Sequence, residues 1–205
     1  MAHTTTMHPT LVDSLWRAEG ASRLSRNIIL VLAGTALIAL SAKINVPMFP
    51  VPMTMQTFAI LVIGMAYGWK LGGATVLAYL AEGVMGLPVF AGPGAGPAYM
   101  MGPTAGYLVG FVFAAAAVGW LAERGWDASP LRTLAANALG TAIIFGFGAL
   151  WLTSFLMAAK GLDVAGGVQA AVASGVLPFL IGAAAKIALA AAVLPLARKA
   201  VTRLR

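Results

Sequence analysis

Two ionisable side chains, Glu82 and Lys186, lie well inside long apolar stretches of this sequence. Ionisable residues at membrane depth are rare, usually functional, and normally have an identifiable partner. Counted from the ends of their segments at ~1.5 Å per helical residue, the two side chains reach similar depths and could form an ion pair. A purely structural ion pair is one interpretation, and a binding site that uses the lysine is the other.

The sequence holds no set of residues suited to catalysis. Both histidines, His3 and His8, lie in the N-terminal tail, and Glu82 is the only acid well inside an apolar segment. A Ser/His pair, a His-rich metal site or a carboxylate dyad therefore cannot be assembled in the membrane. The stretch "GPGAGP" lacks the Gly-Lys-Ser/Thr ending of a phosphate-binding loop. We expect no enzyme activity, no cofactor and no metal site, so energy for any active transport must come from elsewhere.

The composition is that of an integral membrane protein. Of the 205 residues, 60% are hydrophobic and 9% are charged, whereas about a quarter of the residues of a soluble domain are charged. A spanning helix needs ~20 mostly apolar residues. Six segments approach that requirement, the second and third being short and joined by a tight turn at "GWKLGG": about 27–44, 54–69, 71–88, 103–123, 131–155 and 174–197.

These segments predict an all-α protein with one six-helix membrane domain over 27–197. Residues 1–26 would form a cytoplasmic tail, in which 10–26 could lie on the membrane surface as an amphipathic helix. Residues 198–205 would form a basic cytoplasmic tail.

The basic residues predict the orientation of the chain. With both termini in the cytoplasm, only Lys43 and Lys160 lie outside, and Lys186 lies within a span. The other ten of the 13 basic residues are then inside: Arg17, Arg23, Arg26, Lys70, Arg124, Arg132, Arg198, Lys199, Arg203 and Arg205. Cytoplasmic loops carry such an excess. We therefore expect a multi-pass protein of the cell inner (plasma) membrane whose positive charge serves membrane lipids and orientation, not nucleic acid.

The two loops expected on the outer side, "INVPMFPVPMT" and "GLPVFAGPGAGPAYMMGPT", are rich in Pro and Gly yet apolar. Non-helical backbone at membrane depth is tolerated only where protein buries it or it lines a cavity. Plain surface loops are the alternative, but the apolar content favours lids over a pocket.

Three helices should begin on that outer side, near Thr54, near Thr104 and near Ser174 and Pro178. Their N–H groups and dipole-positive ends favour an anion. With Lys186, they predict a site for a small organic anion that has a hydrophobic portion.

Small residues recur at a spacing of four at Gly102, Gly106 and Gly110, and again at Gly64 and Gly68. This spacing lets helix backbones approach closely. Packing within the chain is the favoured interpretation, and a homo-oligomer seam is the alternative.

Three motifs resemble the BioY family: "VPMTMQTFAILVIG" (51–64), "YLAEGVMGLPVFAG" (79–92) and "GPTAGYLVGF" (102–111). Members of that family are the biotin-specific substrate-binding (S) components of energy-coupling factor (ECF) transporters. The resemblance implies an S-component fold of six transmembrane helices that binds biotin from outside with high affinity. It also implies a transmembrane T component and two ABC-type ATPases as partners, which would hydrolyse the ATP.

The final helix departs from the family pattern. Family members usually carry Gly-Asp-x-x-Lys there, and the polar pair contacts biotin. In "GAAAK", Lys186 matches the lysine, and Ala183 stands where the acid is expected. The lysine has lost a neighbour on its own helix face, so Glu82 is the candidate substitute.

The resemblance also implies roles for individual residues. Lys186 would pair with the carboxylate or another anionic edge of biotin, and Glu82 would orient Lys186 or accept from a ureido N–H. The remaining candidates are Thr54 and Gln56 as hydrogen-bonding groups, Phe90, Gly94, Ala95 and Tyr99 in a closing loop, and Tyr107 and Asn137 as polar wall positions.

Family S components also meet the T component through small residues on the first helix, where Thr35, Ala36 and Ala39 could serve here. Two alternatives to a biotin S component stay open. One is an S component for another vitamin, such as thiamine or riboflavin, and the other is a non-transporting membrane scaffold.

Overall fold

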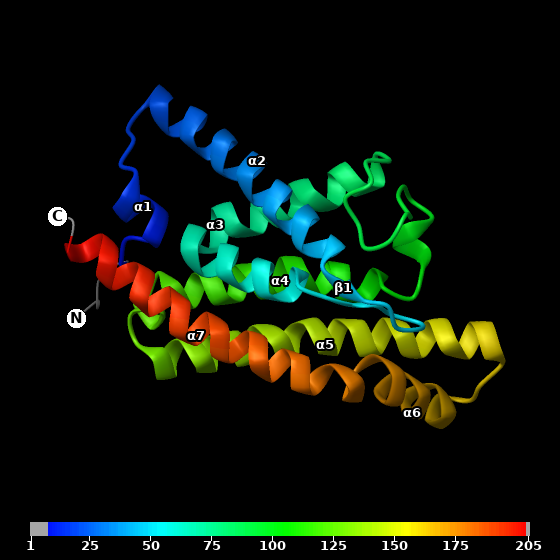
Figure 1. Cartoon of the computed structure of the whole chain (residues 1–205). Coiled ribbons are helices and arrows are strands. Elements are labelled where there is room, and N and C mark those ends of the chain that lie inside the picture. Colours follow the sequence, from blue (N-terminus) through cyan, green and yellow to red (C-terminus); the bar gives the residue numbers. More distant parts are fainter. Residues whose placement is uncertain (1–7, 204–205) are drawn as a thin grey trace, which may run out of the picture.

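The computed structural model describes residues 8–203 of the chain, which form a bundle of long helices (Figure 1). Residues 1–7 and 204–205, with His3 and Arg205, lie outside the described part. The helices are α1 (Leu11–Leu15), α2 (Ala21–Lys43), α3 (Gln56–Val84), α4 (Ala105–Ala122), α5 (Pro130–Lys160), α6 (Val164–Gly175) and α7 (Leu180–Arg203). The shorter elements are the strands β1 (Asn45–Val46) and β2 (Met53–Thr54) and the 3₁₀ turns η1 (Tyr99–Met101), η2 (Trp126–Ala128) and η3 (Leu177–Phe179).

Helix α3 is broken at Gly68 into two antiparallel limbs. Gly68 has φ 81° and ψ 175°, which is outside the helical region and accessible mainly to glycine. The amide of Gln56 donates to the hydroxyl of Tyr79 over 2.7 Å, although a continuous helix would separate these residues by ~35 Å. The two limbs are the second and third predicted segments, and the tight turn between them is confirmed.

The structure therefore confirms the six-helix membrane fold. Within residues 8–203, five helical stretches are long and apolar enough to cross a membrane, with α3 counted once: Ser22–Lys43, Gln56–Val84, Ala105–Ala122, Pro130–Lys160 and Val164–Val201. The break at Gly68 makes two segments of α3 and brings the number to six. All six are held by contacts that run from α2 to α3, α3 to α4, α4 to α5, and α5 to α7.

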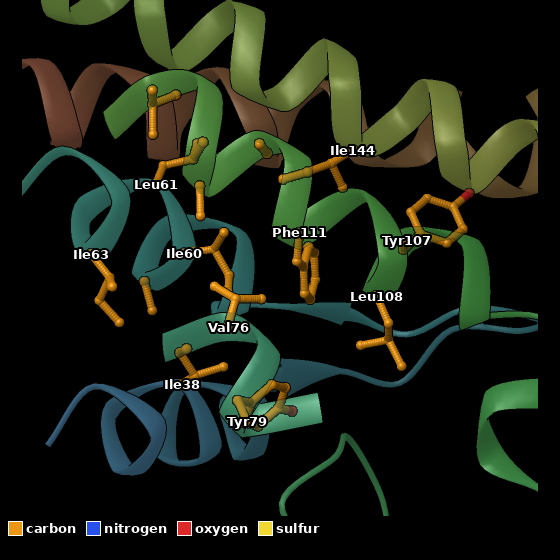
Figure 2. Packing of buried hydrophobic residues seen from close by; sticks show 14 of the residues in the cluster. Ile38, Ile60, Leu61, Ile63, Val76, Tyr79, Tyr107, Leu108, Phe111 and Ile144 are labelled. Atoms are coloured by element: carbon orange, nitrogen blue, oxygen red, sulfur yellow. The ribbon is translucent and has the colours of Figure 1, made fainter. Parts of the chain in front are cut away.

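The core lies between α3, α4 and α5. Ile60 and Leu61 of the first limb of α3, Val76 of the second, Phe111 of α4 and Ile144 of α5 are buried and lie close together (Figure 2). The small residues permit this packing. A Cβ on Gly106 would lie 2.5 Å from the carbonyl oxygen of Phe147 on α5. The glycine faces thus serve contacts within the chain, as favoured above, and not a seam between copies.

Three boundaries differ from the expectations. Segment 10–26 is not one amphipathic helix, because α1 covers only Leu11–Leu15 and α2 begins at Ala21. Residues 198–203 do not form a separate tail, because α7 continues to Arg203.

The final span does not begin at residue 174, because α6 ends at Gly175 and α7 begins at Leu180. Helix α6 itself was not expected. It begins at an Asp163 cap, whose carboxylate accepts from the N–H of Gly166 over 2.9 Å. Its glycines lower intrinsic helix propensity, and packing against α5 stabilises it.

The bundle has two different ends. At one, here the termini end, Arg198 of α7 pairs with Asp127 and contacts the carbonyl of Pro9. Arg26 pairs there with Asp13 over 3.0 Å. At the other, the loop end, the β1–β2 hairpin and the loop 85–104 cover the helix ends (Figure 1).

Candidate functional site

A cavity of about 670 Å³ opens near the loop end, between α3, α4, α5 and α7. Its mostly apolar lining with a few polar groups is typical of small-molecule sites. The lining residues are Val51, Pro52, Thr54, Gln56, Thr57, Leu61, Ala91, Tyr99, Thr104, Tyr107, Leu108, Phe111, Thr141, Phe145, Phe179, Ala183 and Lys186. Both loops that were expected to act as lids contribute to this lining, the first through Val51 and Pro52 and the second through Ala91 and Tyr99.

Lys186 supplies the charge of this cavity. Of the described residues that line it, Lys186 alone is ionisable as a cation or a carboxylate. Its ammonium donates to the carbonyl of Thr54 over 2.5 Å and to the hydroxyl of Thr57 over 3.1 Å. Ala183, one turn earlier on the same helix, also lines the cavity and brings no compensating charge. The Lys186 ammonium has three N–H donors, and two of them are bonded to neutral oxygens. The third donor and the positive charge can still bind an anion.

Lys186 also separates this cavity from a smaller one. The second cavity, of about 390 Å³, shares Thr54 and Lys186 with the first and is otherwise bounded by the β1–β2 hairpin and the residues flanking it. The lysine side chain is therefore a partition between the two cavities.

A chain of hydrogen bonds links the start of α3 to the second loop. The hydroxyl of Thr54 donates to Gln56 Oε1 over 3.2 Å, and Gln56 Nε2 donates to the Tyr79 hydroxyl. The Tyr79 hydroxyl in turn donates to the carbonyl of Val89 over 3.0 Å. Gln56 and Tyr79 are both buried, so these bonds contribute to holding the loop in position.

The second loop is a packed lid. Phe90 is fully buried, stacks on Tyr99 with ring centroids 4.6 Å apart, and meets Tyr79 edge-on at 5.6 Å. Lys43, at the end of α2, donates to the carbonyls of Phe90 and Gly92 over 2.8 and 3.2 Å. The lid thus has aromatic contacts below it and a cationic anchor beside it.

Not every residue expected in the closing loop reaches the cavity. Tyr99 lines it, whereas Phe90 lies behind Tyr99 and acts through that ring. Gly94 packs on the same ring, since a Cβ there would lie 2.6 Å from Tyr99 Cδ2. Ala95 is half-buried in the loop and is not a lining residue.

The two expected wall positions have different outcomes. Tyr107 lines the cavity, and its hydroxyl donates to the carbonyl of Gly175 over 2.8 Å, which ties α4 to the end of α6. Asn137 lies outside the lining, where its amide donates to the carbonyl of Thr133 over 2.8 Å and meets Met65 Sδ at 3.5 Å. Thr141, one turn further along α5, takes the wall position instead. Position along the helix explains the difference, because residues four apart on α5 lie on nearly the same face and Thr141 is one turn nearer the loop end than Asn137.

The expected pairing of Glu82 with Lys186 is wrong. Within residues 8–203 the two side chains form no ion pair, and Glu82 does not line the cavity. Glu82 is on the second limb of α3, whereas Lys186 faces the beginning of the first limb. Similar depth in the membrane is necessary for a pair but does not make two helix faces neighbours.

The three helix starts do converge. Gln56 begins α3, Thr104 precedes α4, and Phe179 precedes α7, and all three line the cavity. The shared chamber that the sequence predicted is therefore present, with Phe179 in place of Ser174 at the final helix.

Sequence reasoning missed Thr57, which contacts Lys186, and most of the apolar wall. Helical spacing could have found the apolar wall. Thr104, Tyr107, Leu108 and Phe111 share one face at the start of α4 at intervals of three and four, so any one of them indicates the rest. It could not have found Thr57, because Thr54 lies in β2 and α3 begins only at Gln56.

The candidate partner positions on α2 face different ways. Thr35 is buried, and its hydroxyl donates to the carbonyl of Leu32, so it does not lie on the outer surface of α2. Ala36 is exposed and Ala39 is half-buried. Of the three, Ala36 is the one that a partner helix could reach directly.

Comparison with known proteins places this architecture. The chain matches the BioY family over residues 8–203. It is 34% identical to a probable biotin transporter BioY of Pyrococcus horikoshii over 157 residues, which cover 77% of this chain and 86% of the relative. It is 36% identical to the biotin transporter BioY of Thermotoga maritima over 153 residues, 74% of this chain and 84% of the relative.

A solved structure gives the same result for the fold. The crystal structure of the S component for biotin from an ECF-type ABC transporter superposes with a TM-score of 0.73 at 25% identity, covering 89% of this chain and 95% of that one. The family match over the whole described part of the chain, the similarity to both relatives and this shared fold agree, and the chain belongs to the BioY family.

Proposed function

We propose that this chain is the S component of an ECF transporter and binds biotin in the cavity beside Lys186. The observation that carries the proposal is that one cation, Lys186, lies in an otherwise uncharged and mostly apolar cavity in a member of this family. Biotin combines a carboxylate with a compact, partly apolar ring system. A cationic vitamin such as thiamine would instead require a carboxylate, and no lining residue supplies one.

The cavity chemistry supports one arrangement of the ligand. The carboxylate accepts from the ammonium of Lys186, beside the Thr57 hydroxyl. The ring system lies against Tyr99, Tyr107 and Phe111, and the ureido group has the hydroxyls of Thr104 and Thr141 within the same lining. Gln56 is held by Tyr79 and Thr54, so we assign it to positioning the lid.

We further propose that the loop end faces outward and the termini end faces the cytoplasm, in the cell inner membrane. The distribution of basic residues supports this orientation. Release inward would then require a T component and ABC-type ATPases, with the face of α2 that carries Ala36 as a contact surface.

Isothermal titration of the purified full-length chain tests the function. We expect saturable binding of biotin, with neither thiamine nor riboflavin displacing it at equal concentration. Displacement by either vitamin would indicate a different substrate. Absence of saturable binding in folded protein would favour the membrane scaffold.

Tyr79→Phe tests the role of the lid. The change removes the hydroxyl that joins Gln56 to the carbonyl of Val89 and leaves a buried amide and a part-buried carbonyl unpaired, so lid opening should become easier by ~1–3 kcal/mol. We expect biotin to dissociate several times faster, with a smaller change in its association rate, in a release assay with labelled ligand. Tyr67→Phe, for which the described structure gives no hydrogen bond of the hydroxyl, is the matched control. Equal release rates for wild type and Tyr79→Phe would contradict this role.

A further inference from the structure

A third cavity lies at the termini end, remote from the proposed biotin site. It has a volume of about 750 Å³ and lies between the last two turns of α7 and the turn η2. Its lining consists of Ala128, Pro195, Arg198, Lys199 and Arg203, so three of its five residues are cations. The lining contains no acid, although Asp127 lies immediately behind it.

The positive charge of this cavity is only partly neutralised within the chain. Arg198 pairs with Asp127, whose side chain is 3% exposed, and it also contacts the carbonyl of Pro9. Lys199 and Arg203 are exposed and form no ion pair within residues 8–203. Arg198 is thereby fixed in place, and two further cations beside it are available to an anion.

The surface above the cavity is apolar. Leu189, Val193 and Leu196 are all exposed on α7. With Arg203 they follow the spacing of four, three and seven residues that places side chains on one helix face. A molecule bound between Lys199 and Arg203 would therefore meet an apolar stripe that leads away from the termini end toward the middle of the membrane.

We propose that this cavity binds the phosphate headgroup of an anionic membrane lipid, with the acyl chains along Leu189, Val193 and Leu196. Arginine forms bidentate hydrogen bonds with phosphate, and lysine adds a compact charge. Basic pockets between membrane helices on the cytoplasmic side are known headgroup sites. Inorganic phosphate shares the headgroup chemistry but would make no use of the apolar stripe, and this distinguishes the two sources.

Native mass spectrometry of the purified full-length chain, titrated with cardiolipin, phosphatidylglycerol or phosphatidylcholine, tests the site. We expect the two anionic lipids to bind in preference to phosphatidylcholine. The double variant Lys199→Gln/Arg203→Gln should bind the anionic lipids at least about tenfold more weakly. The reason is that each cation near an anionic headgroup contributes to the binding free energy, and this variant removes two of them. Lys70→Gln/Arg132→Gln is the matched control, because it removes the same charge at the same end but outside the cavity.

Two measurements keep the result interpretable. The thermal melting temperature and biotin binding of both double variants should match the wild type, which separates a failed lipid site from a failed fold or a failed substrate assignment. The charge-preserving variant Lys199→Arg/Arg203→Lys should retain lipid binding. Equal lipid affinity in wild type and Lys199→Gln/Arg203→Gln, or an equal loss in the control, would overturn the proposal. Displacement of lipid by millimolar inorganic phosphate would overturn the assignment to a lipid.

Discussion

Replacing Lys186 by Met should weaken biotin binding by at least tenfold. A hydrogen bond to a charged group contributes ~1.5–3 kcal/mol, which corresponds to roughly 10- to 150-fold in affinity. The variant also leaves the carbonyl of Thr54 and the hydroxyl of Thr57 without their donor. Met is preferable to Ala because Lys186 separates two cavities, and a short side chain would join them.

A change of ligand shows which group of biotin the lysine contacts. The methyl ester of biotin lacks the negative charge, so it should bind the wild type more weakly than biotin does. The variant Lys186→Met should bind the ester and biotin with about equal affinity. If esterification lowers the affinity for biotin by the same factor in both proteins, Lys186 contacts another part of the ligand or only positions the hairpin. Isothermal titration measures all four combinations, and Lys160→Met removes a charge at an exposed position outside the cavity as the control. Unchanged biotin affinity in folded Lys186→Met would refute the site.

Gly119→Ala should destabilise the fold more than any conservative change in the binding cavity. A Cβ at this position would lie 2.5 Å from Gly68 C, 2.5 Å from Trp69 N and 2.8 Å from Gly64 O, which are all backbone atoms of α3. Backbone cannot rotate aside as a side chain can, so α4 must move away from the break in α3. Overpacking of this kind costs ~1–3 kcal/mol or more. We expect the apparent melting temperature in detergent to fall by roughly 5 °C or more.

Gly146→Ala is the matched control for that variant. Gly146 lies in the middle of α5 and has no atom within 4 Å of a Cβ built there. Alanine is also the better helix former, by ~1 kcal/mol. Its melting temperature should therefore equal or exceed that of wild type. Equal melting temperatures for Gly119→Ala and wild type would show that the close approach of α3 and α4 is not required.

Residues that are decided by local pattern were predictable from the sequence. Apolar length identified the spanning segments, including the two short ones, because a helix must bury its backbone polar groups in lipid and needs a fixed number of residues to cross it. Lys186 was identifiable because a cation in such a segment is costly. The apolar loops and the helix starts at Gln56 and Thr104 likewise indicated where the cavity would lie.

Contacts between distant segments were not predictable in this way. Glu82 and Lys186 reach similar depths, yet the rotation of each helix about its axis directs them to different neighbours. Thr141 and Asn137 share one face of α5, but the cavity reaches only the turn that carries Thr141, and Asn137 lies outside it and donates to Thr133. Phe90 proved to support the lid from behind, because the stacking of its ring on Tyr99 depends on the folded path of the whole loop.

The sequence by itself determined that this is a six-helix membrane protein, that it has one intramembrane cation in its final helix, and that three helix starts and two apolar loops share one end. The first two follow from composition and spacing within single segments, and the last follows from the order of the segments along the chain and the distribution of basic residues. Only the tertiary structure decided that Lys186 is held by Thr54 and Thr57, and that Arg198 of the basic C-terminal segment pairs with Asp127 beside a cavity. The reason is physical. Depth is set along one helix, whereas partners are set by the rotation and packing of several helices at once, and that packing depends on close approaches such as Gly119 against Gly68.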